Sequence, residues 1–259
     1  MHKDLWDRAW RPQLPQRPRV LLNMVSSLDG RAAIGGKAGA IGGESDRRLM
    51  RVLRSRADAV MIGAGTLRSE KISLSIPDDL AYIRASRGLP EQPLHIILIG
   101  ATNPNLENLV NPVPDRTILI INEKSKFSKL GESTPETRDV VRSPADSQGR
   151  IDLQGVMDTL RREHGVDLIL VEGGPSLNHS LLSNGLADEL HLTLASKIIG
   201  GNQPSIISGP SLPNQKYSHG LLSIHTSYEV PEGDLFLRYR LTKSAESNEL
   251  TAGNQASFR

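Results

Sequence analysis

Residues 167–192, DLILVEGGPSLNHSLLSNGLADELHL, contain the transition that decides the fold. The run 168–171 is continuously apolar, which is typical of a strand covered by helices on both faces. The pattern breaks at the Glu-Gly-Gly-Pro of residues 172–175 and resumes as a helix. Glycines at the carboxyl end of a buried strand let the backbone approach a ligand. Other strands that end in the same way would be candidates for the same site.

Short apolar or β-branched runs recur along the chain and predict further strands. They are RVLLNMVSS at 19–27, AVMIG at 59–63, LHIILIG at 94–100, TILIIN at 117–122 and a weaker RDVVRS at 138–143. Helical periodicity separates some of these runs. Interleaved helices and buried strands predict an α/β fold with a mostly parallel central sheet.

Two helices are predicted in detail. The first covers 44–57, with Ser45 or Asp46 as its N-cap and with Leu49, Met50, Leu53 and Ala57 on one face. The second begins near Leu153, places Leu153, Val156, Met157 and Leu160 on one stripe, and is closed by Gly165. Both helices have an apolar side with which to cover the sheet.

The pattern changes near the C-terminus. Residues 219–230 and 234–242 alternate in polarity and are separated by a Pro-Glu-Gly-Asp turn, which predicts an antiparallel hairpin. We therefore expect an N-terminal arm at 1–18, one domain at 19–242 and a disordered polar tail at 243–259.

Composition excludes several classes of protein. Cysteine is absent, so a disulfide framework and cysteine-based metal sites are excluded, and a cytoplasmic location is expected. Aromatic residues make up 3%, and 31 basic residues are balanced by 29 acidic ones, so nucleic acid is not an expected partner. No long apolar run predicts a membrane span, and the scattered histidines predict no metal site.

Three strand-end loops are candidates for chemistry. They contain Asp29, the Gly63-Ala64-Gly65-Thr66 turn and the Glu172-Gly173-Gly174 turn. Free N–H groups at a helix start beside glycines favour phosphate, as in dinucleotide binding. Each feature also has a plain structural explanation: a tight turn for the glycine loops, a helix cap for Glu172 and a solvated basic face for Arg54.

Taken in order, SSLDGRAA, LRSRADAVMIGAGTLRSE and LVEGGPSLNHSLLSNGLADELHLTLASKIIGG resemble one family. It is the reductase (C-terminal) domain of the bifunctional riboflavin-biosynthesis deaminase/reductase, together with its stand-alone relatives. The resemblance covers about 19–241 and implies a dihydrofolate-reductase-like, three-layer fold. It implies NADPH-dependent reduction of a 5-amino-6-(5-phosphoribosylamino)uracil-type substrate to its ribitylamino form, by a homodimer.

Site roles are carried over from that resemblance. Glu172 and Asp29 are the expected catalytic residues, and Arg54, Leu74 and Glu172 the expected substrate contacts. Cofactor contacts are expected at Ser26, Ile41, Gly42, Gly63, Gly65, Thr66, Glu70, Gly173, Gly174, Pro175, Ser176, Leu177 and Asn178. Arg68 is a candidate for the 2′-phosphate of the cofactor.

Two departures from the family pattern keep alternatives open. Asn23 stands where the family has a lysine, and Pro77 where it has an arginine, so two charge-assisted substrate contacts are lost. One alternative is an NADPH reductase of another substrate such as dihydrofolate or a dihydropterin, for which Arg54 or Arg84 would bind a carboxylate. The other is an NADP(H)-binding protein without turnover.

Overall fold

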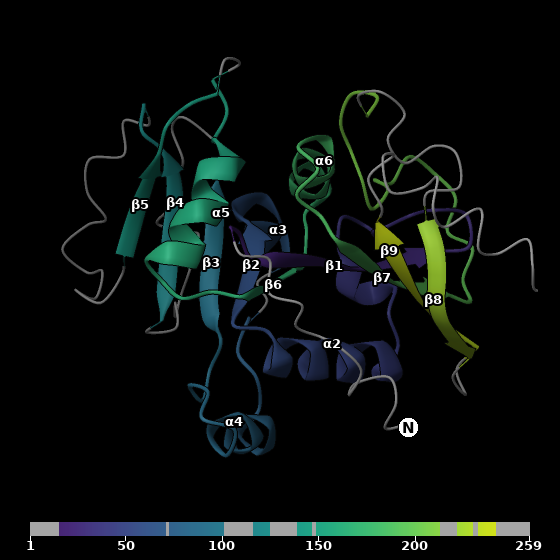
Figure 1. Cartoon of the computed structure of the whole chain (residues 1–259). Helices are drawn as coiled ribbons and strands as arrows, with labels where there is room; N and C mark the ends of the chain where they lie inside the picture. Colours follow the sequence, from purple (N-terminus) through teal and green to yellow (C-terminus); the bar gives the residue numbers. More distant parts are fainter. Residues whose placement is uncertain are drawn as a thin grey trace, which may run out of the picture.

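The computed structural model describes residues 16–70, 73–100, 116–124, 139–146, 149–212, 222–229 and 233–241. The expected tail at 243–259 and most of the expected arm lie outside these residues. Within them, the chain forms one sheet with helices on both faces (Figure 1). This arrangement agrees with the predicted α/β fold.

The sheet contains nine strands in the order β5-β4-β3-β2-β6-β1-β7-β9-β8. Six pairings, from β5 across to β7, are parallel, whereas β9 runs antiparallel to both β7 and β8. The strands are β1 (Arg19–Ser27), β2 (Ala59–Gly63), β3 (Leu94–Ile99), β4 (Thr117–Asn122), β5 (Asp139–Ser143), β6 (Leu168–Val171), β7 (Glu189–Ala195), β8 (Leu222–Glu229) and β9 (Leu235–Leu241). The mostly parallel sheet and its C-terminal hairpin are therefore confirmed.

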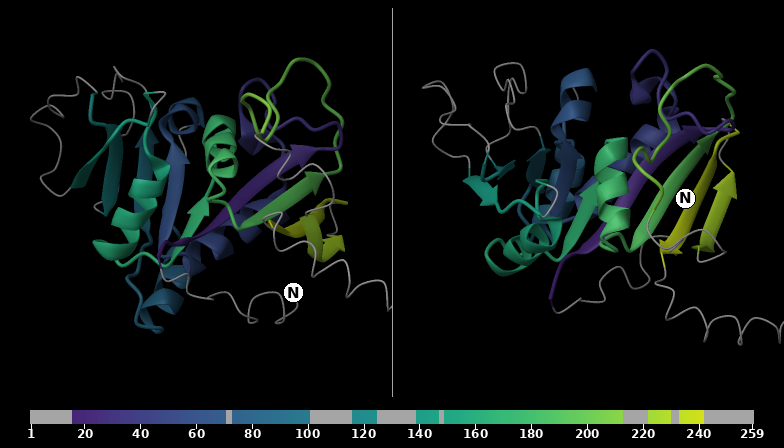
Figure 2. Two further views of the ribbon diagram at one scale, coloured as in Figure 1. Left: turned by 45° about the horizontal axis from the view of Figure 1, so that its top comes forward. Right: turned by 90° about the horizontal axis from the view of Figure 1, so that it is seen from above.

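Helices cover the two faces of this sheet. They are the 3₁₀ turn η1 (Ala38–Ala40), α2 (Glu44–Arg56), α3 (Ala64–Glu70), α4 (Asp78–Ala85), α5 (Leu153–Arg162) and α6 (Pro175–Ser183). In Figure 1, α5 lies in front of β3 and β4 and α6 lies above β1, whereas α2 and α4 lie at the bottom of the view. Figure 2 shows the twist of the strands, with α6 beside β1 in both views.

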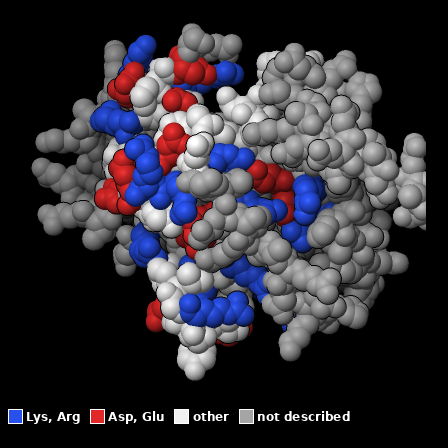
Figure 3. All heavy atoms as spheres, viewed as in Figure 1, with Lys and Arg blue, Asp and Glu red and all other residues white. Residues whose placement is uncertain are grey.

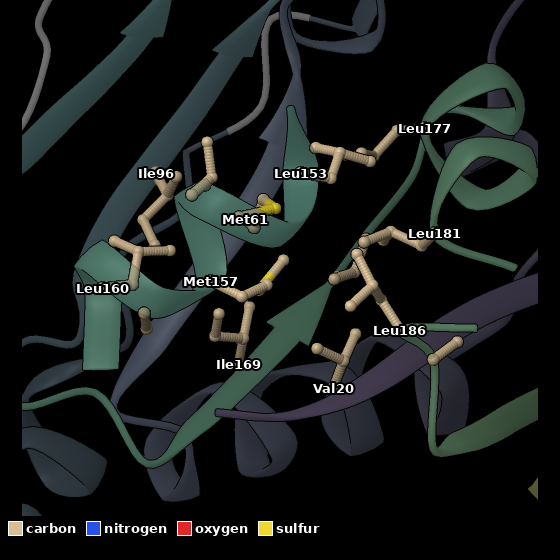
Figure 4. Packing of buried hydrophobic residues seen from close by; sticks show 14 of the residues in the cluster. Val20, Met61, Ile96, Leu153, Met157, Leu160, Ile169, Leu177, Leu181 and Leu186 are labelled. Carbon is tan, nitrogen blue, oxygen red and sulfur yellow. The ribbon is translucent and has the colours of Figure 1, made fainter. Parts of the chain in front are cut away.

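The largest apolar cluster lies on the face covered by α5 and α6. It joins Leu153, Met157 and Leu160 of α5 and Leu177 and Leu181 of α6 to strand residues such as Val20, Met61 and Ile169 (Figure 4). Burial of this stripe confirms the predicted apolar face of α5. Asp152 caps that helix by accepting the N–H of Gln154 at 3.1 Å.

The start of α2 differs from the prediction. Gly43 is the N-cap, without a side-chain hydrogen bond, and the helix begins at Glu44, so Ser45 and Asp46 are inside its first turn. The expected apolar face of α2 is present in part, because Leu49 packs against a cluster that includes Leu21, Leu53 and Leu170, on the face of the sheet that α2 covers. Asp46 turns inward rather than capping the helix.

Helix α4 was not predicted from the sequence. Its apolar pattern is weak, and its buried residues are Ala81 and Arg84. Arg84 donates to the carbonyls of Ser55 and Ala57 at 3.0 and 2.6 Å, and to that of Pro90 at 2.8 Å. An arginine thus anchors α4 to the end of α2, where an apolar contact would be usual.

Candidate active site

The two predicted glycine turns lie side by side at the carboxyl ends of β2 and β6. The N–H of Gly63 donates to the carbonyl of Gly173 at 2.8 Å. A Cβ on Gly174 would stand 2.3 Å from Oγ1 of Thr66, so α3 and α6 approach too closely for any side chain at this position. The Gly173–Gly174 peptide is cis, and Gly173 has a φ of +84°. Close packing at Gly174 and the positive φ of Gly173 thus explain these two glycines without any ligand.

A cavity of about 540 Å³ opens beside these turns. It is lined by Gly63, Ala64, Gly65, Thr66, Ser69, Leu98, Ile99, Gly100, Asp146, Gly149, Arg150, Ile151, Leu153, Gly174, Pro175, Ser176, Leu177, Ser180 and Asn184. Its volume is in the range of small-molecule and cofactor sites. A Cβ on Gly65 would meet no atom within 4 Å, so the backbone here faces open space. Helix α6 begins at this cavity with no side chain capping its first N–H groups. These features suit the phosphates of a dinucleotide.

The predicted cofactor residues divide into two groups. Gly63, Gly65, Thr66, Gly174, Pro175, Ser176 and Leu177 line the cavity together. Ser26, Ile41, Gly42, Gly173 and Asn178 are not among its lining residues, and the side chain of Glu70 lies outside the described part of the chain.

Asn178 faces the other side of α6. Its Nδ2 donates to the carbonyl of Ile206 at 2.8 Å and contacts Sδ of Met24 at 3.0 Å. It therefore fastens the 199–212 loop to the sheet, a role that was not predicted from the sequence. Ser26 is also buried, and its hydroxyl donates to the carbonyl of Ser27 at 2.9 Å.

Two walls of the cavity were not predicted from the sequence. One is the end of β3 at Leu98–Gly100, and the other is the turn that contains Asp146 and Gly149–Ile151. The first wall follows a predicted strand, so the rule that ligands bind at carboxyl ends could have found it. The second depends on where β5 lies in the sheet, which no local pattern reports.

Glu172 and Arg54 form a buried ion pair. Nε and Nη2 of Arg54 donate to the two carboxylate oxygens of Glu172, each at 2.6 Å, and the side chains are 3% and 6% exposed. Nη1 of Arg54 donates to the carbonyls of Ser73 and Ser75 at 2.7 and 3.3 Å. Arg54 is therefore not on a solvated basic face, and Glu172 does not cap α6.

The other predicted site residues have structural partners. Oδ1 of Asp29 accepts from the Ser27 hydroxyl at 2.6 Å and from the N–H of Ile199 at 3.0 Å, and Oδ2 accepts from Gly200 at 2.7 Å. These hydrogen bonds, led by that of Ser27, lower the pKa of Asp29 to about 2. Leu74 is buried in the apolar cluster of β2, β3, β4 and α3. Asp29 joins two loops at the end of β1 and β7.

A carboxyl group that was predicted to cap α2 lies near Glu172. Burial raises the pKa of Asp46, and the charges of Asp234 and Glu172 raise it further, against the lowering effects of Thr193 and Arg47. A Cβ on Gly42 would stand 2.1 Å from Oδ2 of Asp46, so the glycine makes room for this carboxyl. Ile41, next to it, is fully buried, and its carbonyl accepts from Nζ of Lys197 at 2.6 Å.

A second buried charge cluster lies at the start of β7. Glu189 binds Arg19 and Arg238, with Arg238 at 2.8 and 2.9 Å. Burial by itself would raise the pKa of Glu189, but hydrogen bonds from His191 and Arg238 and the charge of Arg19 hold it well below its usual range. This cluster joins β1, β7 and β9.

Among the described residues, no group of three or more metal-ligating side chains could hold a metal ion, and no helix is long and apolar enough to cross a membrane. On the described part of the face in Figure 3, positive and negative side chains alternate over short distances. That face has no broad region of a single charge.

Comparisons with known proteins agree with this geometry. The RibD C-terminal domain family matches residues 18–233. The 2,5-diamino-6-ribosylamino-4(3H)-pyrimidinone 5′-phosphate reductase of Methanothermobacter thermautotrophicus is 27% identical over 226 residues, covering 86% of this chain and 98% of its own length. The riboflavin biosynthesis protein RibD of Actinobacillus pleuropneumoniae is 30% identical over 73% of this chain and 48% of its own.

Solved structures share the fold. A pyrimidine reductase-like protein from Corynebacterium diphtheriae has a TM-score of 0.68 at 22% identity, covering 88% of this chain and 93% of its own. The RibD of Acinetobacter baumannii has a TM-score of 0.68 at 18% identity, covering 88% of this chain and 59% of its own. The dihydrofolate-reductase-like fold expected from the sequence is thus confirmed, and the chain belongs to the RibD C-terminal domain family.

Proposed function

We propose that this chain is an NADPH-dependent reductase that converts a phosphoribosylamino-pyrimidine to its ribitylamino form. The observation that carries the proposal is the cavity at the carboxyl ends of β2, β3 and β6, where two glycine turns meet beside the Arg54–Glu172 pair. NADPH would supply hydride to the ribose carbon that bears the amine. The protein's task is to bind and orient the two reactants.

The cavity wall would hold the phosphates. The first N–H groups of α6, those of Ser176 and Leu177, adjoin the open backbone of Gly65, and all three residues line the cavity. An uncapped helix start and an exposed backbone favour anionic oxygen atoms. Thr66 and Ser69 add hydroxyl groups to the same wall.

Glu172 would act on the substrate side. Both of its oxygens are held by Arg54, so the carboxylate has one orientation and no freedom to turn. Each oxygen has a second lone pair with which to accept a substrate hydroxyl or amine. A fixed negative charge beside an amine that gains positive charge favours the transition state.

The dihydrofolate alternative loses its main support. It needs an arginine for a substrate carboxylate, and Arg54 is engaged with Glu172 and with the carbonyls of Ser73 and Ser75. Arg84 is buried and donates to three carbonyl oxygens. Neither arginine offers the geometry which that substrate requires.

The direct test is oxidation of NADPH by the purified protein. Two phosphoribosylamino-pyrimidines are compared, the 5-amino-uracil and the 2,5-diamino-pyrimidinone, with dihydrofolate as the control substrate. The diamino compound is included because it is the substrate that the name of the Methanothermobacter relative specifies. Turnover of either pyrimidine supports the proposal. NADPH binding without any pyrimidine turnover would contradict it and favour a binding protein.

The expected homodimer and the cytoplasmic location remain predictions. The last strand in the sheet order, β8, is the edge through which we expect a second copy to pair. Sedimentation of the purified chain at the mass of a monomer would contradict the dimer.

A further inference from the structure

The cavity has one positively charged residue among the described residues that line it. This residue is Arg150, whose side chain is 53% exposed. The one negatively charged residue among them is Asp146, from the same turn. The remainder of the described lining is uncharged, so this turn dominates the local electrostatics of the cavity.

Asp146 presents Arg150 to the cavity. Its Oδ1 accepts the backbone N–H of Arg150 at 2.8 Å, and its Oδ2 accepts Nε–H at 2.9 Å. The backbone closes the turn as well, because the N–H of Asp146 donates to the carbonyl of Arg150 at 2.6 Å. These bonds use the inner nitrogen of the guanidinium. The outer nitrogens, Nη1 and Nη2, make no hydrogen bond within the described part of the chain.

The turn is fixed to the sheet. Nδ2 of Asn122, at the end of β4, donates to the carbonyl of Gly149 at 2.9 Å. Gly149 has a φ of +76°, a conformation that suits glycine. Arg150 therefore stands on a support anchored at the carboxyl end of β4.

The order of the strands places this support at one end of an elongated site. Gly174 follows β6, Gly65 follows β2, and Gly100 follows β3, while the turn is anchored to the next strand, β4. Three steps between neighbouring strands span about 14 Å, a length suited to an extended dinucleotide. With its reacting ring near Glu172, the adenosine end of such a ligand reaches the turn.

We propose that Arg150, presented by Asp146, binds the 2′-phosphate of the cofactor's adenosine ribose and thereby sets the preference for NADPH over NADH. A planar guanidinium with two outer nitrogens matches a phosphate with paired hydrogen bonds. In Rossmann folds, an acidic residue beside the adenosine ribose accepts the 2′-hydroxyl of NAD, whereas an arginine accommodates the 2′-phosphate of NADP. Here both carboxylate oxygens of Asp146 accept hydrogen bonds from Arg150. The pair therefore favours NADPH, whereas Asp146 alone would favour NADH. The inference rests on the proposed function and names the residue that selects its cofactor.

The test is calorimetric binding of adenosine 2′,5′-bisphosphate and adenosine 5′-monophosphate to the full chain. The variants are Arg150→Gln and Arg150→Lys, with Arg162→Gln as the matched control, because Arg162 is an exposed arginine on α5 that does not line the cavity. The wild type is expected to bind the bisphosphate roughly 10- to 100-fold more tightly, the effect of hydrogen bonds to a charged group. Arg150→Gln should reduce this ratio to near unity with unchanged binding of the monophosphate. Arg150→Lys should keep part of the preference, and Arg162→Gln all of it.

Each other outcome counts against the inference in a distinguishable way. A preference that survives in Arg150→Gln would assign the phosphate to another residue such as Arg68. Equal loss of both ligands would make Arg150 a general support of the cavity. A wild type that binds the bisphosphate and the monophosphate equally would overturn the inference alone. A parallel titration in which the wild type binds neither NADPH nor NADH would overturn the proposed function with it.

Discussion

The cavity wall and the α2-covered face of the sheet differ in how they hold their polar groups. Glycines, hydroxyl groups and backbone N–H groups make up much of the wall, and among its described residues the charged ones are Asp146 and Arg150. The α2 face has charges that are buried and mutually bound, such as Arg54–Glu172 and the cluster around Glu189. Ligand binding at the cavity wall depends on backbone groups that are open to the ligand. Stability at the α2 face depends on buried charges that neutralise one another. Substitutions at the open backbone of the wall should therefore weaken ligand binding, whereas substitutions in the buried ion pairs should act most strongly on the free energy of unfolding.

The largest expected effect is on the Arg54–Glu172 pair. Glu172→Gln leaves the buried guanidinium of Arg54 without its counter-charge, which should lower the free energy of unfolding by about 3–5 kcal/mol. Urea denaturation measures the change, and Glu44→Gln is the control, since Glu44 pairs with Arg47 on the exposed face of the same helix. The double variant Arg54→Met/Glu172→Met should recover most of the loss. Turnover should fall in the single and in the double variant. If Glu172→Gln were as stable as the wild type, the proposed difference between the cavity wall and the α2 face would be wrong.

The buried histidine on the α2 side should make folding sensitive to acid. Burial, aided by the charge of Arg54, lowers the pKa of His95 from 6.5 to about 4. Because the unfolded chain takes up this proton first, stability is complete above pH 6.5 and decreases as the pH falls toward 4. A difference of one between the folded and unfolded pKa values corresponds to about 1.4 kcal/mol, so the total loss is about 3 kcal/mol. Thermal unfolding of His95→Leu between pH 7 and 4 should show a flatter slope than wild type, and an identical slope would refute the assignment.

On the cavity side, Gly174→Ala should act on binding and packing together. The added Cβ would meet Oγ1 of Thr66 at 2.3 Å, so α3 and α6 must separate, at about 1–3 kcal/mol of stability. NADPH binding, followed by fluorescence, should weaken as well. Gly65→Ala is the matched variant, because its Cβ meets no atom within 4 Å. That substitution should spare stability and weaken binding alone; a loss of stability equal to that of Gly174→Ala would argue against an open cavity at Gly65.

The smallest effect is expected at Asp46. Burial raises its pKa, so the folded state disfavours the charged form, and stability decreases as the pH rises through the folded pKa. Asp46→Asn should therefore stabilise the protein at neutral pH, by up to about 1 kcal/mol. The stabilising difference should disappear in acid, where Asp46 is protonated. A destabilised Asp46→Asn would show that the carboxylate, rather than the acid, is required at this position.

Much of the fold could be predicted because its signals are local. Continuous apolar runs predicted β2, β3, β4 and β6, and the stripe of α5 predicted its buried face, since both follow from the period of a strand or a helix. Helix α4 was missed because an arginine bound to carbonyl oxygens anchors it, and this leaves no apolar stripe to detect. The N-cap of α2 was missed because Asp46 turns toward the sheet instead of its own helix.

The site divides in the same manner. Residue types alone were enough to predict the glycine turns at Gly63–Thr66 and Gly173–Gly174, because a tight backbone approach leaves a local mark in the sequence. The pairing of Glu172 with Arg54, 118 positions away, and the position of Asp146 and Arg150 at the far wall of the cavity emerged only from the folded chain. Charges and strand ends interact through space, and the order of strands in the sheet, not the order of residues in the chain, sets which of them meet.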